Sequence, residues 1–237
     1  METVITAIEE KKGSRKRKIY VNGEWRFSLY PGQIHQYQLK EGMEFSDALY
    51  QQIGKETLLP QAKKRVLNLL TARDRTRREL LEKLAGDGYP EEVCTAAVEY
   101  AESYHYVDDL RFAITYLRSY EEEKSRLQLS MKLKEKGILR EVADEAFEVV
   151  REERKERMGE EFEEAEIVAL RRQIAKKTKN AAPSKKDSAK LFASLAAKGF
   201  SSSDIRSIFK EIEDRNILKE IEDCSTFKKM EEFGDWE

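Results

Sequence analysis

The chain has 237 residues, 38% of them charged, and contains only 11 glycines and 4 prolines. This length allows one large domain or two ordinary ones with a buried core, and the composition favours long solvated helices over β-sandwiches or barrels. The net charge of -2 argues against strong binding to free DNA through the surface as a whole.

Two further features concern the compartment. Cys94 and Cys224 lie far apart without ligand-type neighbours, which indicates ordinary thiols rather than disulfides or a zinc site. The N-terminal residues mix acids and bases where a signal peptide needs an apolar run, and no later stretch approaches the about 18 apolar residues of a membrane span. We therefore expect a soluble, cytoplasmic protein.

The N-terminal segment has the pattern of a small sheet. Hydrophobic and polar residues alternate around Asn22-Gly23, a dipeptide that tolerates the positive φ angles of a type I′ turn, and this predicts a hairpin over residues 17–30. The segment from Val4 to Ile8 supplies a third strand, because an isolated hairpin is marginal in water. The basic run KKGSRKRK then connects this strand to the hairpin, within a β-rich extension of residues 1–55.

From about Leu59 the hydrophobic period becomes helical, and the pattern repeats. Five positions recur after 49 residues, and a third copy has one extra residue before its last position. The recurring positions are Thr76, Leu80, Leu84, Gly88 and Val93, then Ser125, Leu129, Leu133, Gly137 and Val142, then Asp187, Leu191, Leu195, Gly199 and Ile205.

Each recurring position has a physical meaning. The first can cap a helix N-terminus, and Glu79 and Gln128 complete capping boxes in two copies. The leucines form an inward stripe, and each glycine suits the left-handed conformation that ends a helix. Another amphipathic helix follows each glycine, with Pro90 in the first turn of the first of them. Each copy also has a preceding helix, expected over residues 60–72, 108–121 and 160–178.

The predicted fold is therefore mostly α, with three tandem three-helix repeats behind a small β-rich extension. Such repeats stack into an elongated, curved molecule with long binding faces. Segment 176–190 is expected to be a flexible loop. The expected boundaries are 59–107, 108–155 and 160–222 for the repeats and 223–237 for an acidic, disordered tail.

An enzyme needs a constellation of reactive groups, and the sequence offers none. His35 and His105 lack a second ligand at metal-binding spacing, and there is no phosphate loop, dinucleotide fingerprint or H-E-x-x-H motif. Asp108 and Asp109 precede an apolar helical run, so a helix start explains them better than a metal site. We expect a non-enzymatic protein without catalytic residues, metal or cofactor.

One stretch, YHYVDDLRFAITYLRS (residues 104–119), is similar to the G-Y-[ILV]-[DN]-D-x-x-[FY]-A segment of the RecX family. The run LNLLTARDRTRRELLEKLAGDGYPEEVCTAAV resembles that family's first repeat, and SRLQLSMKLKEKGI resembles its second. The similarity is clear over residues 60–150 and weaker in the third repeat. His105 replaces the family's glycine, and Ser119-Tyr120-Glu121 lacks the glycine often found after the helix.

The resemblance implies a monomeric regulator that lies in the groove of a RecA filament on DNA and restrains its ATPase and strand exchange. The sequence itself leaves inhibition or stimulation open. The alternative is a sequence-nonspecific nucleic-acid-binding repeat protein that acts without a recombinase, and a passive helical scaffold is a third interpretation.

Local charge indicates where a partner binds. Between Gln61 and Leu84 there are eight bases and three acids, whereas the twelve acids and four bases from Glu141 to Glu166 have the pattern of a solvated helix face. Arginines at a helix boundary reach phosphate or acidic protein surface, and the lysines of 176–190 suit DNA better than a shaped protein surface. The predicted partner-binding residues are Lys63, Lys64, Arg73, Arg75, Arg77, Arg78, Arg111, Lys176, Lys177, Lys185 and Lys186. The residues expected to pack between repeats are Tyr106, Val107, Phe112, Tyr116 and Leu117.

Overall fold

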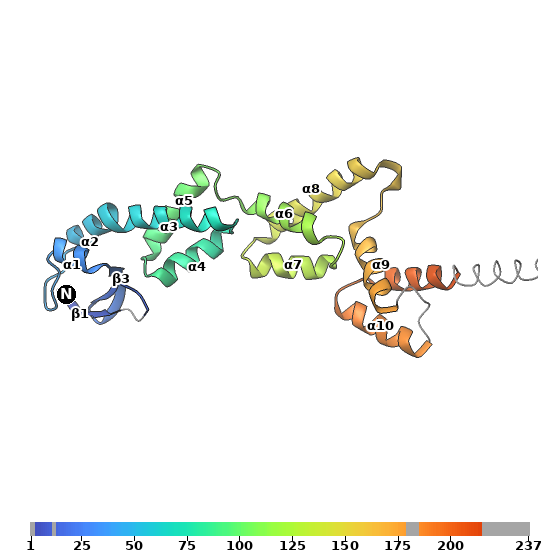
Figure 1. Ribbon diagram of the computed structural model, residues 1–237, viewed down its shortest axis with the longest axis horizontal. Coiled ribbons are helices and arrows are strands. Elements are labelled where there is room, and N and C mark those ends of the chain that lie inside the picture. Colours follow the sequence, from blue (N-terminus) through green and yellow to red (C-terminus); the bar gives the residue numbers. More distant parts are fainter. Residues whose placement is uncertain (1–2, 11–12, 179–184, 215–237) are drawn as a thin grey trace, which may run out of the picture. The chain divides into compact units, whose positions relative to one another are not determined.

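The computed structural model describes residues 3–10, 13–178 and 185–214, without the side chains of 185 and 186 (Figure 1). The described residues fall into two compact units. One comprises the described residues up to Phe112 with the short turn Lys136–Ile138, and the other comprises Ala113–Glu135 with the described residues from Leu139 onward. Each unit is described by itself.

The first unit begins with the predicted three-stranded sheet, which is confirmed. Its strands are antiparallel in the order β1-β2-β3. Asn22 and Gly23 have φ angles of 51° and 83°, as a type I′ turn requires. Ile5, Ile19 and Phe27 are fully buried on the inner face. The strands are β1 (Ile5–Glu10), β2 (Arg17–Val21) and β3 (Glu24–Leu29).

Two helices that were not predicted from the sequence follow the sheet. Ser46 begins α2, because its hydroxyl accepts a hydrogen bond from the amide of Leu49 at 3.2 Å. The ring of Tyr50 on α2 lies 5.9 Å from Phe27 and 6.1 Å from Phe45, which ties the helix to the sheet. A π-helical turn then leads from α2 directly into the first repeat (Figure 1). The elements are α1 (Pro31–Gln36), α2 (Asp47–Ile53) and the π turn Gly54–Leu58.

The first repeat has the three predicted helices. The hydroxyl of Thr76 accepts a hydrogen bond from the amide of Glu79 at 3.2 Å, so Thr76 caps α4 as predicted. Gly88, with φ of 93°, ends that helix. Leu80 and Leu84 enter a core that is continuous with the inner face of the sheet. The helices are α3 (Leu59–Ala72), which lies beside the other two (Figure 1), α4 (Arg77–Asp87) and α5 (Glu91–Ser103).

The second and third repeats follow the same plan. The Ser125 hydroxyl accepts from the Gln128 amide at 3.2 Å, and the Gln128 side chain accepts from the Ser125 amide at 3.3 Å, which is the predicted capping box. Gly137 and Gly199 have φ angles of 84° and 91° at the ends of their helices. The elements are α6 (Asp109–Tyr120), α7 (Arg126–Glu135), α8 (Arg140–Met158), a 3-10 turn Gly159–Glu161, α9 (Ala165–Thr178), α10 (Lys185–Ala197) and a helix over 202–214.

Three details of the third repeat were predicted wrongly. Its first helix, α9, begins at Ala165 rather than at 160, because Gly159 and the 3-10 turn first end α8. Both ends of the expected loop 176–190 are helical, while 179–184 lie outside the described residues. Asp187 lies within the first turn of α10 rather than before it. The expected tail 223–237 also lies outside the described residues.

Candidate partner-binding surface

The four predicted arginines of the first repeat helices lie where α3 ends and α4 begins, but they have different environments. Arg77 is held within the fold: its guanidinium pairs with Glu102, and its amide donates to the Asp109 carboxylate at 2.9 Å. The hydrogen bond with Glu102 raises the pKa of Arg77 above its ordinary value. Arg77 therefore joins α4 to α5 and to the start of α6.

Arg78 is also engaged. Its Nε lies 3.2 Å from the Glu82 carboxylate, one helical turn further along α4. Its side chain packs against the turn at Gly137, where an added Cβ would lie 2.5 Å from the Arg78 Cβ. The charge of Arg78 is thus paired within α4, while its stem packs at the repeat junction.

Arg73 and Arg75 lie nearer to solvent. The Arg73 side chain is 58% exposed, and its Nη2 lies 3.8 Å from the Glu79 carboxylate. At this distance and exposure an ion pair contributes little. The Arg75 Nε donates to the carbonyl oxygen of Leu69 at 3.4 Å, which satisfies an acceptor in the last turn of α3. Arg73 is consequently the more available of the two for a partner.

On α3, Lys63 and Lys64 point in different directions. The Lys63 ammonium lies 4.0 Å from the ring centroid of Tyr100 on α5, a cation–π contact. Lys64 is exposed and forms no ion pair within the described part of the chain. Lys64 is thus free to contact a partner.

Next to Lys63 lies a row of three tyrosines that the sequence did not reveal as a surface. The ring of Tyr104 lies 5.0 Å from that of Tyr100 and 6.0 Å from that of Tyr106, with only 14° between the last two planes. Tyr104 and Tyr106 are 56% and 52% exposed. We call Tyr100, Tyr104 and Tyr106 the tyrosine row.

The prediction that Tyr106 packs between repeats is wrong. His105 has a φ of 56°, a left-handed conformation, and the chain there turns the neighbouring tyrosine outward. The Arg111 guanidinium donates to the carbonyl oxygens of His105 and Tyr106 at 3.2 and 3.5 Å and holds this turn. Val107 and Leu117 are buried as expected, whereas Phe112 and Tyr116 are half-buried.

The predicted cations near the C-terminus belong to the second unit. Lys176 is exposed, whereas the Lys177 ammonium donates to the Ser194 hydroxyl at 2.7 Å. Lys185 and Lys186 form the first turn of α10, and their side chains lie outside the description. The structure thus does not bring the two predicted basic groups into one unit.

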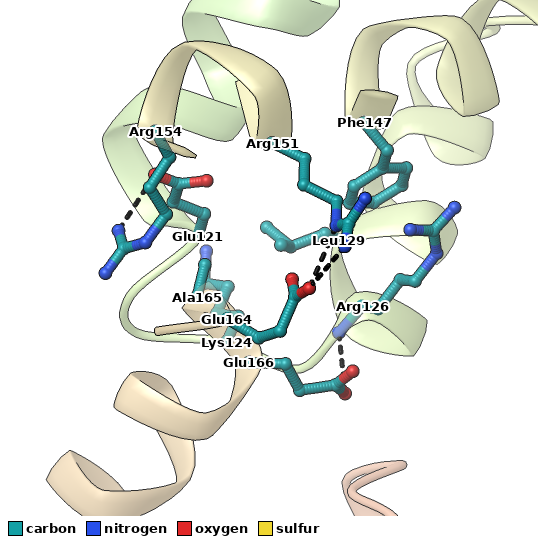
Figure 2. Close-up of a pocket in the computed structure, with 10 residues that line it drawn as sticks. All are labelled: Glu121, Lys124, Arg126, Leu129, Phe147, Arg151, Arg154, Glu164, Ala165 and Glu166. Carbon is teal, nitrogen blue, oxygen red and sulfur yellow. Dashed lines mark hydrogen bonds and ion pairs between the residues drawn. The ribbon is translucent and has the colours of Figure 1, made fainter. Parts of the chain in front are cut away.

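The second unit contains a cavity of about 90 Å³ whose charges are already matched (Figure 2). Arg151 donates to Glu164 at 2.9 Å, and the Arg126 amide donates to Glu166 at 3.1 Å. Arg154, only 3% exposed, pairs with Glu122 at 2.7 Å. Part of the acidic block is therefore a junction between repeats, and not only the solvated helix face that was expected.

The remaining features limit the chemistry. Asp108 caps α6 as predicted, since its carboxylate accepts from the Arg111 amide at 2.9 Å. In the described residues no cluster of His, Cys, Asp and Glu could hold a metal ion. None of the described helices is long and apolar enough to span a membrane.

Known protein domains match the first two repeats of this chain. The model of the first three-helix domain of RecX matches residues 62–100, and that of the second three-helix domain matches residues 108–146. Two crystal structures share the fold. One is of regulatory protein RecX, with a TM-score of 0.55 and 23% identity, and the match covers 88% of this chain and 99% of that one. The other is of RecX from Lactobacillus salivarius, with a TM-score of 0.52 and 20% identity, and the match covers 66% of this chain and 97% of that one.

Curated relatives agree with the domain matches. Regulatory protein RecX of Levilactobacillus brevis is 31% identical over 146 residues, which are 61% of this chain and 55% of that protein. The chain thus spans about half of that relative. Regulatory protein RecX of Clostridium acetobutylicum is 27% identical over 216 residues, which are 89% of this chain and 97% of that protein. From the order of the matched domains and these relatives, the chain belongs to the RecX family.

Proposed function

We propose that this protein binds RecA nucleoprotein filaments and lowers their ATP hydrolysis and strand exchange, as a cytoplasmic monomer without catalysis of its own. The observation that carries the proposal is the match of the first and second RecX three-helix domains, in order, to the first two repeats. Relatives named regulatory protein RecX align with 89% and 88% of the chain, so the resemblance extends beyond those repeats.

The first repeat offers a suitable contact surface. Lys64 and Arg73 are exposed, and Arg75 lies two residues after Arg73 in sequence. The exposed rings of Tyr104 and Tyr106 lie in the same unit. Tyrosine and arginine are enriched in protein interfaces because they combine large apolar area with hydrogen-bonding groups. This combination supports a nucleoprotein partner that presents both protein and phosphate.

A titration of the protein into cognate RecA on single-stranded DNA, with ATP hydrolysis as the readout, tests the proposal. We expect hydrolysis to fall as the protein is added and to reach a plateau at saturation. Unchanged hydrolysis, with binding to the filament verified by sedimentation, would overturn inhibition, and an absence of co-sedimentation would overturn filament binding itself.

Binding to nucleic acid without a recombinase is the second candidate. It predicts steep salt dependence, with a log-log slope of about -5 for six phosphate contacts on duplex DNA. The internal pairing of Arg77 and Arg78 leaves fewer cations for such contacts in the predicted cluster. The net charge of -2 also argues against strong binding of free nucleic acid by the surface as a whole.

A further inference from the structure

A basic hollow lies in the first unit, and none of the residues that line it was assigned above to the partner surface. It has a volume of about 690 Å³ and is lined by Glu10, by residues 13–17 and by Tyr30 and Pro31 at the start of α1. Its charged lining consists of Arg15, Lys16, Arg17 and the carboxylate of Glu10. Three cations against one carboxylate give this lining a positive charge.

The carboxylate does not neutralise the hollow. Glu10 is 88% exposed, and it lies 3.7 Å from Arg17, whose side chain is 43% exposed. An ion pair of this length and exposure is readily replaced by another anion. Arg15 is exposed at the rim. Both arginines line the hollow, and a guanidinium group binds phosphate well because its donors form a planar fork.

An aromatic wall completes the hollow. Lys16 is only 7% exposed, and its ammonium lies 4.2 Å from the ring centroid of Tyr89 and 5.4 Å from that of Tyr30. This buried cation fixes the position of Tyr30, which also lines the hollow and is 44% exposed. The hollow therefore offers a flat apolar ring beside its cations.

A second lysine and a second aromatic ring lie further along the hairpin. Side chains two residues apart on a strand lie on one face, so Lys18 shares the face of Lys16. The Lys18 ammonium lies 5.0 Å from the ring centroid of Trp25, which is 42% exposed. Both exposed rings lie near the turn Gly88-Tyr89 that follows α4. Trp25 packs against Gly88. Tyr30 and Tyr89 both contact the Lys16 ammonium. The hairpin face that adjoins the hollow therefore presents Lys18 beside a second exposed ring, while Lys16 is buried beneath Tyr30 and Tyr89.

We propose that this hollow and the adjoining hairpin face bind single-stranded nucleic acid, with backbone phosphates on Arg15 and Arg17 at the hollow and on Lys18 at the hairpin face, and with bases stacked on Tyr30 and Trp25. Cations that follow a backbone and aromatic rings that stack on bases are the two components of single-strand binding, and the bases of a duplex are not available for such stacking. An acidic peptide would use the cations but not the rings. The site is independent of the proposed action on the recombinase.

The test measures binding of a fluorescent 30-nucleotide oligothymidine to the full chain at several salt concentrations. Arg15→Gln with Arg17→Gln should weaken binding at least tenfold at low salt and reduce the log-log salt slope by about 1.4, since each single-strand contact contributes about 0.7. Tyr30→Leu keeps an apolar side chain but removes the ring, so it should weaken binding without changing the slope.

The matched control is Arg140→Gln with Lys155→Gln, which removes the same charge from exposed positions of the second unit. It should bind like the wild type. An equal loss in the control, or wild-type affinity in a folded Arg15/Arg17 variant, overturns the site. Loss of binding to polyglutamate but not to the oligonucleotide would also overturn it, in favour of an acidic protein partner. Because no recombinase is present, these outcomes are separate from those of the ATPase titration.

Discussion

The hydroxyl group of Thr76 donates a hydrogen bond of 2.6 Å to the carbonyl oxygen of Lys136, although 60 residues separate the two in sequence. The same hydroxyl accepts from the Glu79 amide, so one side chain both caps α4 and fixes the turn after α7. In the second unit, Ser125 caps α7 in the same way and donates to the carbonyl oxygen of Lys198. The helix cap of one repeat therefore also binds the glycine turn of the next.

This double role predicts a large effect of a small change at Thr76. Thr76→Val keeps the shape but removes the cap and leaves the Lys136 carbonyl without this donor, so unfolding in urea should show a loss of roughly 1–3 kcal/mol. Thr71→Val is the control, because the Thr71 hydroxyl is exposed and bonds only within its own helix. Losses of equal size at the two positions would contradict a role in the junction.

The glycine that follows Lys136 supports a second prediction. Gly137 has a φ of 84°, and an added Cβ would lie 2.5 Å from the Arg78 Cβ. Gly137→Ala should therefore combine the about 1–2 kcal/mol cost of the left-handed conformation with an overpacking cost of about 1–3 kcal/mol. Gly42→Ala is the control for the conformational cost alone, since Gly42 has a φ of 78° and nothing within 4 Å of its Cβ direction. Equal melting temperatures for the two variants would show that the added methyl group at Gly137 causes no overpacking against Arg78.

Local signals allowed most of the fold to be predicted. Asn22-Gly23 defines its turn, Thr76 and Ser125 define helix starts, and Gly88 defines a helix end through interactions within a few residues. Helices α1 and α2 were not predicted, because they are short and are stabilised by packing on the sheet.

The surface was harder to predict because its state depends on residues far away in sequence. Arg77 belongs to the same cluster of arginines in the sequence as Arg73, yet Glu102, 25 residues further on, engages it. In the same way Glu79, expected to complete a capping box, contacts the Lys136 ammonium at 2.9 Å instead. Tyr106 faces outward because His105 adopts the positive φ that the glycine of related sequences would adopt easily.

The half-buried carboxylate of Asp109 at the start of α6 predicts a pH dependence. Burial raises the pKa of Asp109 above its ordinary value of 3.8, despite the hydrogen bond from the Arg77 amide. The folded state then holds the proton more tightly than the unfolded state, so this group's contribution to stability decreases as pH rises from about 3.8 through the raised pKa. Asp109→Asn keeps an oxygen acceptor for the amide and removes the titration.

Urea unfolding of the wild type and Asp109→Asn between pH 3.5 and 7 measures this contribution. The stability difference should shift in favour of the variant as pH rises. A difference that is constant with pH, or that shifts in favour of the wild type, would contradict a raised pKa at this position. The contributions of the other carboxylates to the pH dependence of stability cancel in this difference, because both proteins contain them.

The final prediction separates contact from fold on the first repeat. Lys64→Glu with Arg73→Glu reverses two exposed charges that contribute little to internal pairing, so the melting temperature should change by no more than a few degrees. Binding to the RecA filament on DNA should weaken at least tenfold, which requires only about 1.4 kcal/mol. Arg77→Glu should instead lower the melting temperature, because it places a third carboxylate beside Glu102 and Asp109.

The matched control for that pair is Arg140→Glu with Lys155→Glu, which reverses two exposed charges in the second unit. Co-sedimentation with the filament and thermal melts on all three variants give the two readouts. If the Lys64/Arg73 variant is folded and binds like the wild type, these residues are not in the interface. Lys176→Glu then tests the next exposed cation, since Lys176 forms no ion pair within the described part of the second unit.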